Sequence, residues 1–162
     1  MGKAKWVTAI AEQEAKTRVL HIALFLGLAA SLAGGCGMGK AKGEAEQVAA
    51  AFFDALRQQD HEAAMELFSE KFFEETSREE WRNILDKVGE KLGTPESRKL
   101  VRWYVFAGKD KRGLSGTTVD LSYEVTYEKY PAQVFMVVNR PLRGGDFKIV
   151  SMNINSRGLL LE

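Results

Sequence analysis

The spacing of the apolar residues changes near residue 95, and this change limits the class of fold that the chain can adopt. Between residues 44 and 91 apolar residues recur every three or four positions, which is the spacing of amphipathic helices. Between residues 98 and 155 the chain is rich in Val, Tyr, Phe, Thr and Ile, which suit half-buried strands. The sequence therefore predicts an α+β domain whose helices cover one face of a sheet.

Three helices are predicted in the first half of the domain, over residues 44–59, 60–68 and 78–91. Asp60 can cap the second helix through its side-chain oxygen. Ser77 and Glu80 form a capping-box pattern at the start of the third helix, and Gly93 ends it. These helices precede all of the predicted strands.

Four strands are predicted in the second half, over Arg98–Ala107, Thr117–Glu128, Gln133–Arg140 and Phe147–Asn155. Glycine-containing turns separate most of them, including Gly108–Gly116 and Arg143–Asp146. Short connections of this kind join antiparallel neighbours. We therefore expect a curved, four-stranded antiparallel sheet with the three helices on one face.

A short apolar run lies near the start of the chain. Lys16 and Arg18 precede 14 residues, Val19 to Leu32, which are almost all apolar and are followed by small residues. This order is the layout of a secretory signal peptide, whereas a membrane-spanning helix needs about 20 apolar residues. We therefore predict that residues 1–35 form a signal-peptide helix.

The residues around the single cysteine have a recognisable order: Leu32, Ala33, Gly34, Gly35 and Cys36. This order resembles the lipobox of bacterial lipoproteins. The resemblance implies that a peptidase recognises the first four residues and cuts before Cys36, whose sulfur carries a diacylglyceryl group. Two or three acyl chains anchor a protein stably, and one chain anchors it only marginally. The alternatives are a buried free cysteine and an uncleaved anchor helix.

The same lipobox resemblance implies a location. A lipoprotein of this kind is held in the cell envelope, on the periplasmic side of a membrane. Gly37 follows the cysteine, and in a Gram-negative organism the absence of Asp at this place implies the outer membrane. Residues 36–43 contain three glycines after Cys36 and read as a flexible tether, so a single domain is expected over residues 44–162.

Several short motifs, together with the order of elements, indicate a family. The motifs are Phe52-Phe53-x-x-Leu56, Gln59-Asp60, Ser77-x-x-x-Trp81 and Lys91-Leu92-Gly93-x-x-x-Ser97-Arg98. They look like small exported domains of unknown function in the nuclear-transport-factor-2-like (cystatin-like) superfamily. That resemblance implies a cone-shaped α+β fold, and it leaves activity open, because the superfamily includes isomerases, dehydratases, protein-binding modules and lipoproteins.

A pocket between the sheet and the helices is the expected location of a binding or catalytic site. Five large aromatic residues are candidates for its lining, although core packing is the default expectation for them: Trp81, Trp103, Tyr104, Tyr123 and Tyr127. Isomerases of the superfamily pair a buried acid with a Tyr. Asp120, Glu124 and Glu128 alternate with the tyrosines and should face the other way. Asp86, Asp120 and Glu80 stay open as candidate acids, and we expect no catalytic role for His61.

Charge divides the domain into two parts. Residues 44–96 carry a net charge of −8, and residues 97–162 carry +5. Six basic residues are candidates for one patch that would face anionic lipid or an acidic partner: Arg98, Lys99, Arg102, Lys109, Lys111 and Arg112. The alternative is that these charges complement the acidic helices.

The remaining classes of function have little support. One cysteine and two histidines offer no metal-ligand spacing, no cofactor motif is present, and a net charge of +1 gives no reason to expect nucleic acid. We therefore expect a membrane-tethered, non-enzymatic binding or protein-interaction module. Its partners are the bilayer, through acylated Cys36, and an envelope protein or small apolar ligand. The alternative is a small-molecule isomerase or dehydratase that uses the sheet–helix pocket.

Overall fold

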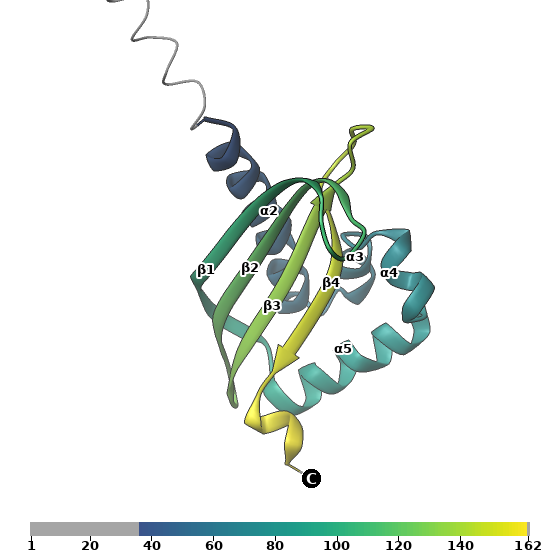
Figure 1. Ribbon diagram of the computed structural model, residues 1–162. Helices are drawn as coiled ribbons and strands as arrows, with labels where there is room; N and C mark the ends of the chain where they lie inside the picture. Colours follow the sequence, from purple (N-terminus) through teal and green to yellow (C-terminus); the bar gives the residue numbers. More distant parts are fainter. Residues whose placement is uncertain (1–35, 162) are drawn as a thin grey trace, which may run out of the picture. The chain divides into compact units, whose positions relative to one another are not determined.

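The computed structural model describes residues 36–161 (Figure 1). In chain order its elements are α2 Cys36–Arg57, α3 His61–Met65, α4 Glu70–Glu75, α5 Arg78–Leu92, β1 Pro95–Lys109, β2 Ser115–Tyr127, β3 Pro131–Arg140, β4 Lys148–Asn155 and the 3-10 helix η2 Arg157–Leu160. The predicted signal peptide, with its recognition residues Leu32, Ala33, Gly34 and Gly35, lies outside the described residues. No helix among residues 36–161 is long and apolar enough to cross a membrane.

The four strands form one open antiparallel sheet in the order β1-β2-β3-β4. Each strand pairs with the next along the chain because the connections between them are short. The predicted α+β class and its four antiparallel strands are therefore confirmed. A register shift between Leu100 and Arg102 interrupts the pairing of β1 with β2, and such a bulge bends a strand.

The helices gather on one face of the sheet, with α2 running behind the strands (Figure 1). The burial of β2 follows from this arrangement, because its side chains alternate between the covered face and the open face. Leu121 and Tyr123 are buried against the helices, while Glu124 lies on the other face and is exposed. The predicted alternation of tyrosines and acids is confirmed.

The space between the helices and the sheet is filled by side chains. Phe53 of α2 lies edge-on to Tyr123 of β2, with ring centroids 5.5 Å apart. Phe68, after α3, lies 5.4 Å from the indole of Trp81 at the start of α5. The largest fully buried residues come from both layers: Phe52, Phe53, Met65, Leu85, Leu92, Leu121, Met136, Ile149, Val119, Val125, Val134 and Val138. Helices and strands therefore share one core.

The first helix is longer than the sequence predicts. α2 begins at Cys36 and not near residue 44, so segment 37–43, which we predicted as a flexible tether, is helical. Ala41 is 3% exposed and extends the buried stripe of the helix by one turn. A bond from Lys42 Nζ to Glu46 Oε2, 2.7 Å long, also spans one helical turn. Burial and this ion pair offset the low helix propensity of the three glycines.

The structure also contains a helix that the sequence did not predict. α4 has six residues and begins after Ser69, whose hydroxyl accepts a bond from the Phe72 N–H. Backbone bonds join this region to β4, because Ser69 N–H donates to Ile149 O at 2.9 Å and Ile149 N–H donates to Leu67 O at 2.9 Å. Distant residues therefore stabilise α4, and its own sequence carries no extended apolar stripe.

The predicted helix ends are present. The Asp60 side chain accepts a bond from the Ala63 N–H at 3.0 Å, and the Ser77 hydroxyl accepts from the Glu80 N–H at 3.1 Å. Gly93 ends α5 with a φ of 80°, a value that favours glycine. These caps define the start of α3 and both ends of α5, which is followed by β1.

Candidate functional site

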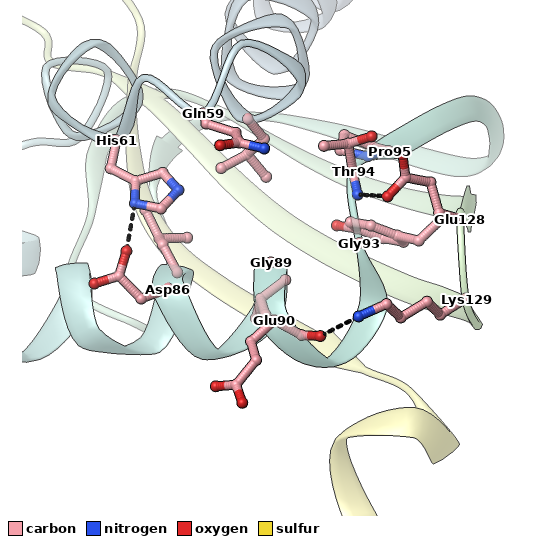
Figure 2. Close-up of a pocket in the computed structure, with 14 residues that line it drawn as sticks. Gln59, His61, Asp86, Gly89, Glu90, Gly93, Thr94, Pro95, Glu128 and Lys129 are labelled. Carbon is pink, nitrogen blue, oxygen red and sulfur yellow. Dashed lines mark hydrogen bonds and ion pairs between the residues drawn. The ribbon is translucent and has the colours of Figure 1, made fainter.

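A pocket of about 360 Å³ opens beside α5, next to the turn that joins α2 to α3 and the neighbouring ends of β1 and β2 (Figure 2). Its apolar wall is formed by Leu56, Leu85, Val88, Pro95 and Tyr127. A volume near 300 Å³ is the lower limit for ordinary ligand pockets. The pocket is therefore large enough for a small molecule.

Two charged or ionisable side chains meet at one side of this pocket. The His61 Nδ1 lies 2.8 Å from the Asp86 Oδ1. Asp60 caps α3 and thereby places His61 in its first turn, while Asp86 projects from the middle of α5. Because Asp86 accepts, the proton of a neutral His61 lies on Nδ1. Figure 2 shows the second ring nitrogen turned away from Asp86 and toward the pocket, where it can bond to a ligand.

Tyr127 supplies a buried hydroxyl on the sheet side. The residue is 3% exposed, and among the described residues its hydroxyl oxygen has no hydrogen-bond partner. Burial raises the pKa of Tyr127 well above its usual range. The hydroxyl is therefore protonated at neutral pH and can donate a hydrogen bond.

The far side of the pocket is made by the start of β1 and the end of β2. The Thr94 N–H donates to Glu128 Oε2 at 3.0 Å, and this bond lowers the pKa of Glu128. The Lys129 ammonium donates to the Glu90 backbone oxygen at 2.6 Å. Figure 2 shows the Glu90 carboxylate directed away from the pocket, so Asp86 and Glu128 are the carboxylates that contribute charge to it.

Two backbone positions in the lining depart from ordinary local preferences. Gln59 has a φ of 57° at the end of α2, where the Asp60 N–H donates to Ala55 O at 2.9 Å and closes the helix; glycine is more usual at such a left-handed position. Gly89 lies inside α5, where glycine is about 1 kcal/mol less favourable than alanine. Within residues 36–161, no atom lies within 4 Å of the point where a Cβ of residue 89 would stand. The packing of the protein therefore does not account for this glycine.

Among the described residues, none of the three candidate acids, Asp86, Asp120 and Glu80, is hydrogen-bonded to Tyr127. Asp86 bonds to His61, Asp120 bonds to Arg112 at 3.0 Å, and Glu80 is exposed. Across the same residues, no group of three His, Cys, Asp or Glu side chains is placed to hold a metal ion.

The five aromatic residues predicted as possible pocket lining lie in different places. Tyr127 lines the pocket described above, whereas Trp81 and Tyr123 are buried in the core. Trp103 pairs with Leu121 and is therefore on the helix side of the edge strand, where it is 46% exposed and lies 5.6 Å below the Lys42 Nζ. Tyr104 points to the open face of the sheet. There it borders a separate hollow of about 300 Å³ with Phe135.

The six basic residues do not all lie on one face of the sheet. Arg98 faces the helices, with its guanidinium 5.5 Å from the Phe53 ring centre. Lys99 and Arg102 lie on the opposite face of β1. Lys109 ends β1, and Lys111 follows in the hairpin loop. Arg112, in the same loop, bonds to Asp110 at 2.7 Å and to Asp120 at 3.0 Å.

Sequence reasoning did not identify most of the residues that form the pocket. It placed His61 at the start of the second helix but gave it no role, and it had no reason to connect His61 with Asp86. Gly89 was a usable signal, because a lone glycine inside an amphipathic helix often has a packing or functional cause. The left-handed Gln59 carries no comparable signal in the sequence.

Comparison with protein-family models, curated proteins and solved structures finds no significant match to this chain. The pocket and its chemistry are therefore interpreted from the residues themselves.

Proposed function

We propose that this protein is a lipoprotein of the cell envelope whose α+β domain is a non-enzymatic binding module. The observation that carries the proposal is the order Leu32-Ala33-Gly34-Gly35-Cys36 at the end of an apolar run too short to span a bilayer. In this proposal residues 1–35 direct export as a signal-peptide helix. Acylated Cys36 then holds the domain on the periplasmic side, in the outer membrane if the organism is Gram-negative.

The fold is consistent with the superfamily resemblance. Helices on one face of a bent antiparallel sheet are what a nuclear-transport-factor-2-like cone requires, and we propose that the domain is a member of that superfamily. Because that fold hosts both enzymes and binding modules, the choice between them rests on the site. The filled core, and a Tyr127 hydroxyl that is paired with none of the described residues, support a binding module.

The anchor is tested by expressing the full chain and its Cys36→Ala variant in a bacterial host with labelled palmitate. We expect label and a processed chain for the unaltered protein, and an unlabelled precursor for Cys36→Ala. Ser31→Ala, inside the apolar run, is the matched control and should be acylated normally. Mass spectrometry of membrane extracts completes the test: an intact chain that keeps residues 1–35 and has no acyl mass contradicts the proposal.

One observation favours the alternative function, a small-molecule isomerase or dehydratase. The second ring nitrogen of His61 faces the pocket while Asp86 holds the first, an arrangement in which a histidine can act as a base. Such an enzyme also needs an acid near the substrate. If the alternative holds, His61→Ala abolishes turnover while the unfolding midpoint stays within a few degrees.

A further inference from the structure

Three segments of the chain meet at one end of the sheet: the N-terminal part of α2, the β1–β2 hairpin and the β3–β4 connection. The Arg140 guanidinium, at the end of β3, donates to Glu44 Oε2 of α2 at 2.5 Å. Backbone atoms of Arg140, Pro141 and Leu142 lie next to Gly116 at the start of β2. These contacts place residues 40–44, 109–116 and 140–148 side by side.

Positive charge is concentrated in these three segments. They carry eight basic and three acidic side chains, whereas the rest of residues 36–161 carries 11 basic and 16 acidic side chains. The segments therefore have a net charge of +5 and the remainder has −5. We call residues 40–44, 109–116 and 140–148 the basic end. Its field attracts anions although the domain as a whole is nearly neutral.

Three cations of the basic end are available to a partner. Lys109, Lys111 and Arg143 are exposed, and within residues 36–161 none of the three forms an ion pair. Asp146 is the one acidic side chain in the β3–β4 connection, so positive charge stays in excess there. Exposed cations held on two neighbouring loops suit a broad anionic surface.

An apolar side chain projects among these cations. Leu142 is 75% exposed and directly precedes Arg143, in the β3–β4 connection that extends beyond the sheet (Figure 1). Leucine beside Lys and Arg is typical of segments that lie in the headgroup region of a bilayer. Among possible anionic surfaces, the basic end therefore fits anionic phospholipid best.

The sequence also connects the basic end with the proposed anchor. Cys36 precedes Lys40 by four residues, and four residues span at most about 14 Å. If Cys36 is acylated, the basic end stays within that reach of the bilayer. Binding to the bilayer is then intramolecular, so one leucine and a few cations are sufficient for it.

We infer that the basic end lies on the anionic headgroups of the membrane that holds the anchor. Leu142 enters the headgroup region, and Lys109, Lys111 and Arg143 contact lipid phosphates. The pocket beside α5 is lined by the start of β1 and the end of β2, which are at the other end of the sheet, and so it faces away from the bilayer. This inference rests on the proposed lipoprotein function and names the lipid class that the domain contacts.

Paramagnetic relaxation tests the inference without a change to the protein. The full acylated chain, labelled with 15N, is held in nanodiscs of phosphatidylcholine, or of equal parts phosphatidylcholine and phosphatidylglycerol, each with a nitroxide-labelled headgroup. The anchor alone brings the basic end near the nitroxide, so the two lipid compositions are compared. We expect relaxation of amides 142–145 to be enhanced at least threefold more in the anionic discs. Amides 158–160 follow Ser156, which bonds to Pro131 at the other end of β3, and should change little.

Two pairs of matched variants identify the contacts. Each basic residue near an anionic surface strengthens binding about fivefold, so Lys109→Gln with Lys111→Gln should at least halve the enhancement in anionic discs. Lys87→Gln with Lys99→Gln removes the same charge from exposed sites outside the basic end and should have no effect.

The second pair compares two exposed leucines. Leu142→Ser should also at least halve the enhancement, because its side chain no longer enters the headgroup region. Leu160→Ser is the control, since Leu160 is 81% exposed in η2. Unfolding midpoints measured for all variants show that each one is folded.

The outcomes separate this inference from the anchor. Equal enhancement in the two kinds of disc, or equal losses for the two lysine pairs, would overturn the contact with anionic lipid. The acyl mass is measured first. An acylated chain without dependence on phosphatidylglycerol contradicts the basic end alone. A chain without acyl mass that shows the dependence contradicts the anchor and supports the lipid contact, and a chain that shows neither contradicts both.

Discussion

The His61 Nδ1 and the Asp86 Oδ1 lie 2.8 Å apart, and this contact joins the first residue of α3 to the middle of α5. The His61 side chain is 20% exposed and the Asp86 side chain is 56% exposed. The pair therefore lies at the rim of the pocket and is partly exposed to solvent. Its main effect is to orient the imidazole, because water weakens the attraction between partly exposed groups.

Replacement of Asp86 tests this view. We expect Asp86→Ala to lower the free energy of unfolding by less than about 1 kcal/mol, the range of exposed pairs. Urea denaturation measures the change, and Asn83→Ala, an exposed substitution on the same helix, is the control. A loss above about 2 kcal/mol would show instead that the pair is a structural support of α3.

Trp81 has a different role, because it is 6% exposed and packs against other rings. Its indole lies 5.4 Å from Phe68 and 5.0 Å from Phe72, centre to centre. Trp81→Ala should therefore lower the free energy of unfolding by roughly 3–5 kcal/mol. Among residues 36–161 its ring N–H has no partner, so Trp81→Phe sacrifices no hydrogen bond and should cost much less. Equal losses in the two variants would contradict a core-packing role.

Tyr127→Phe removes a buried donor that has no hydrogen-bond partner in the part of the chain that the structure describes. Since an unsatisfied buried polar group costs about 1–3 kcal/mol, we expect this variant to be at least as stable as the unaltered protein at pH 8. The exposed substitution Tyr104→Phe serves as the control. A marked loss of stability in urea denaturation would mean that the hydroxyl has a strong partner in solution.

The same residue predicts how stability changes in alkaline solution. The pKa of Tyr127 is raised in the folded state, so its contribution is complete below the unfolded value of about 10 and is lost as the pH rises above it. At pH 11 the unfolded state gains about 1.4 kcal/mol from the ionisation of this one group. Tyr127→Phe should reduce the fall in stability between pH 8 and pH 11 by that amount. Tyr123, whose pKa burial raises to about 12, keeps its own contribution.

The parts of the fold that the sequence predicted depend on local patterns. The alternation along β2 is visible in the order of Leu121, Ser122 and Tyr123, because neighbouring strand residues face opposite sides. α4 has no such pattern, and its position depends on backbone bonds to Ile149, far away in the chain. The start of α2 was missed because the three glycines of segment 37–43 indicated a flexible tether, while buried Ala41 continues the helix.

The site was less predictable for a related reason. Nothing in the sequence shows that His61 and Asp86 come together, since the packing of α3 against α5 decides it. Nearness in sequence was also misleading for the basic residues. Arg98 and Lys99 are neighbours in β1, yet they face opposite sides of the sheet. Hydrophobic periodicity therefore predicts elements, while pockets and charged patches depend on how those elements meet.

The hairpin between β1 and β2 depends on a glycine at position 116. Gly116 pairs with Gly108 and has a φ of 115°. A Cβ at residue 116 would overlap the backbone oxygen of Arg140, the last residue of β3. Backbone atoms cannot move aside as a flexible side chain can. Gly116→Ala should therefore lower the free energy of unfolding by about 3 kcal/mol or more, from left-handed strain and steric overlap together.

A substitution at Gly113, in the same hairpin, distinguishes the cost of left-handed strain from the cost of steric overlap. It has a φ of 79°, and no atom lies within 4 Å of its Cβ position. Gly113→Ala carries the conformational cost alone and should lower stability by about 1–2 kcal/mol. Urea denaturation of both variants at one pH measures the difference. Similar losses at the two sites would mean that the backbone around Arg140 moves aside, and that the close approach of the hairpin to this strand end does not fix the register of β1 and β2.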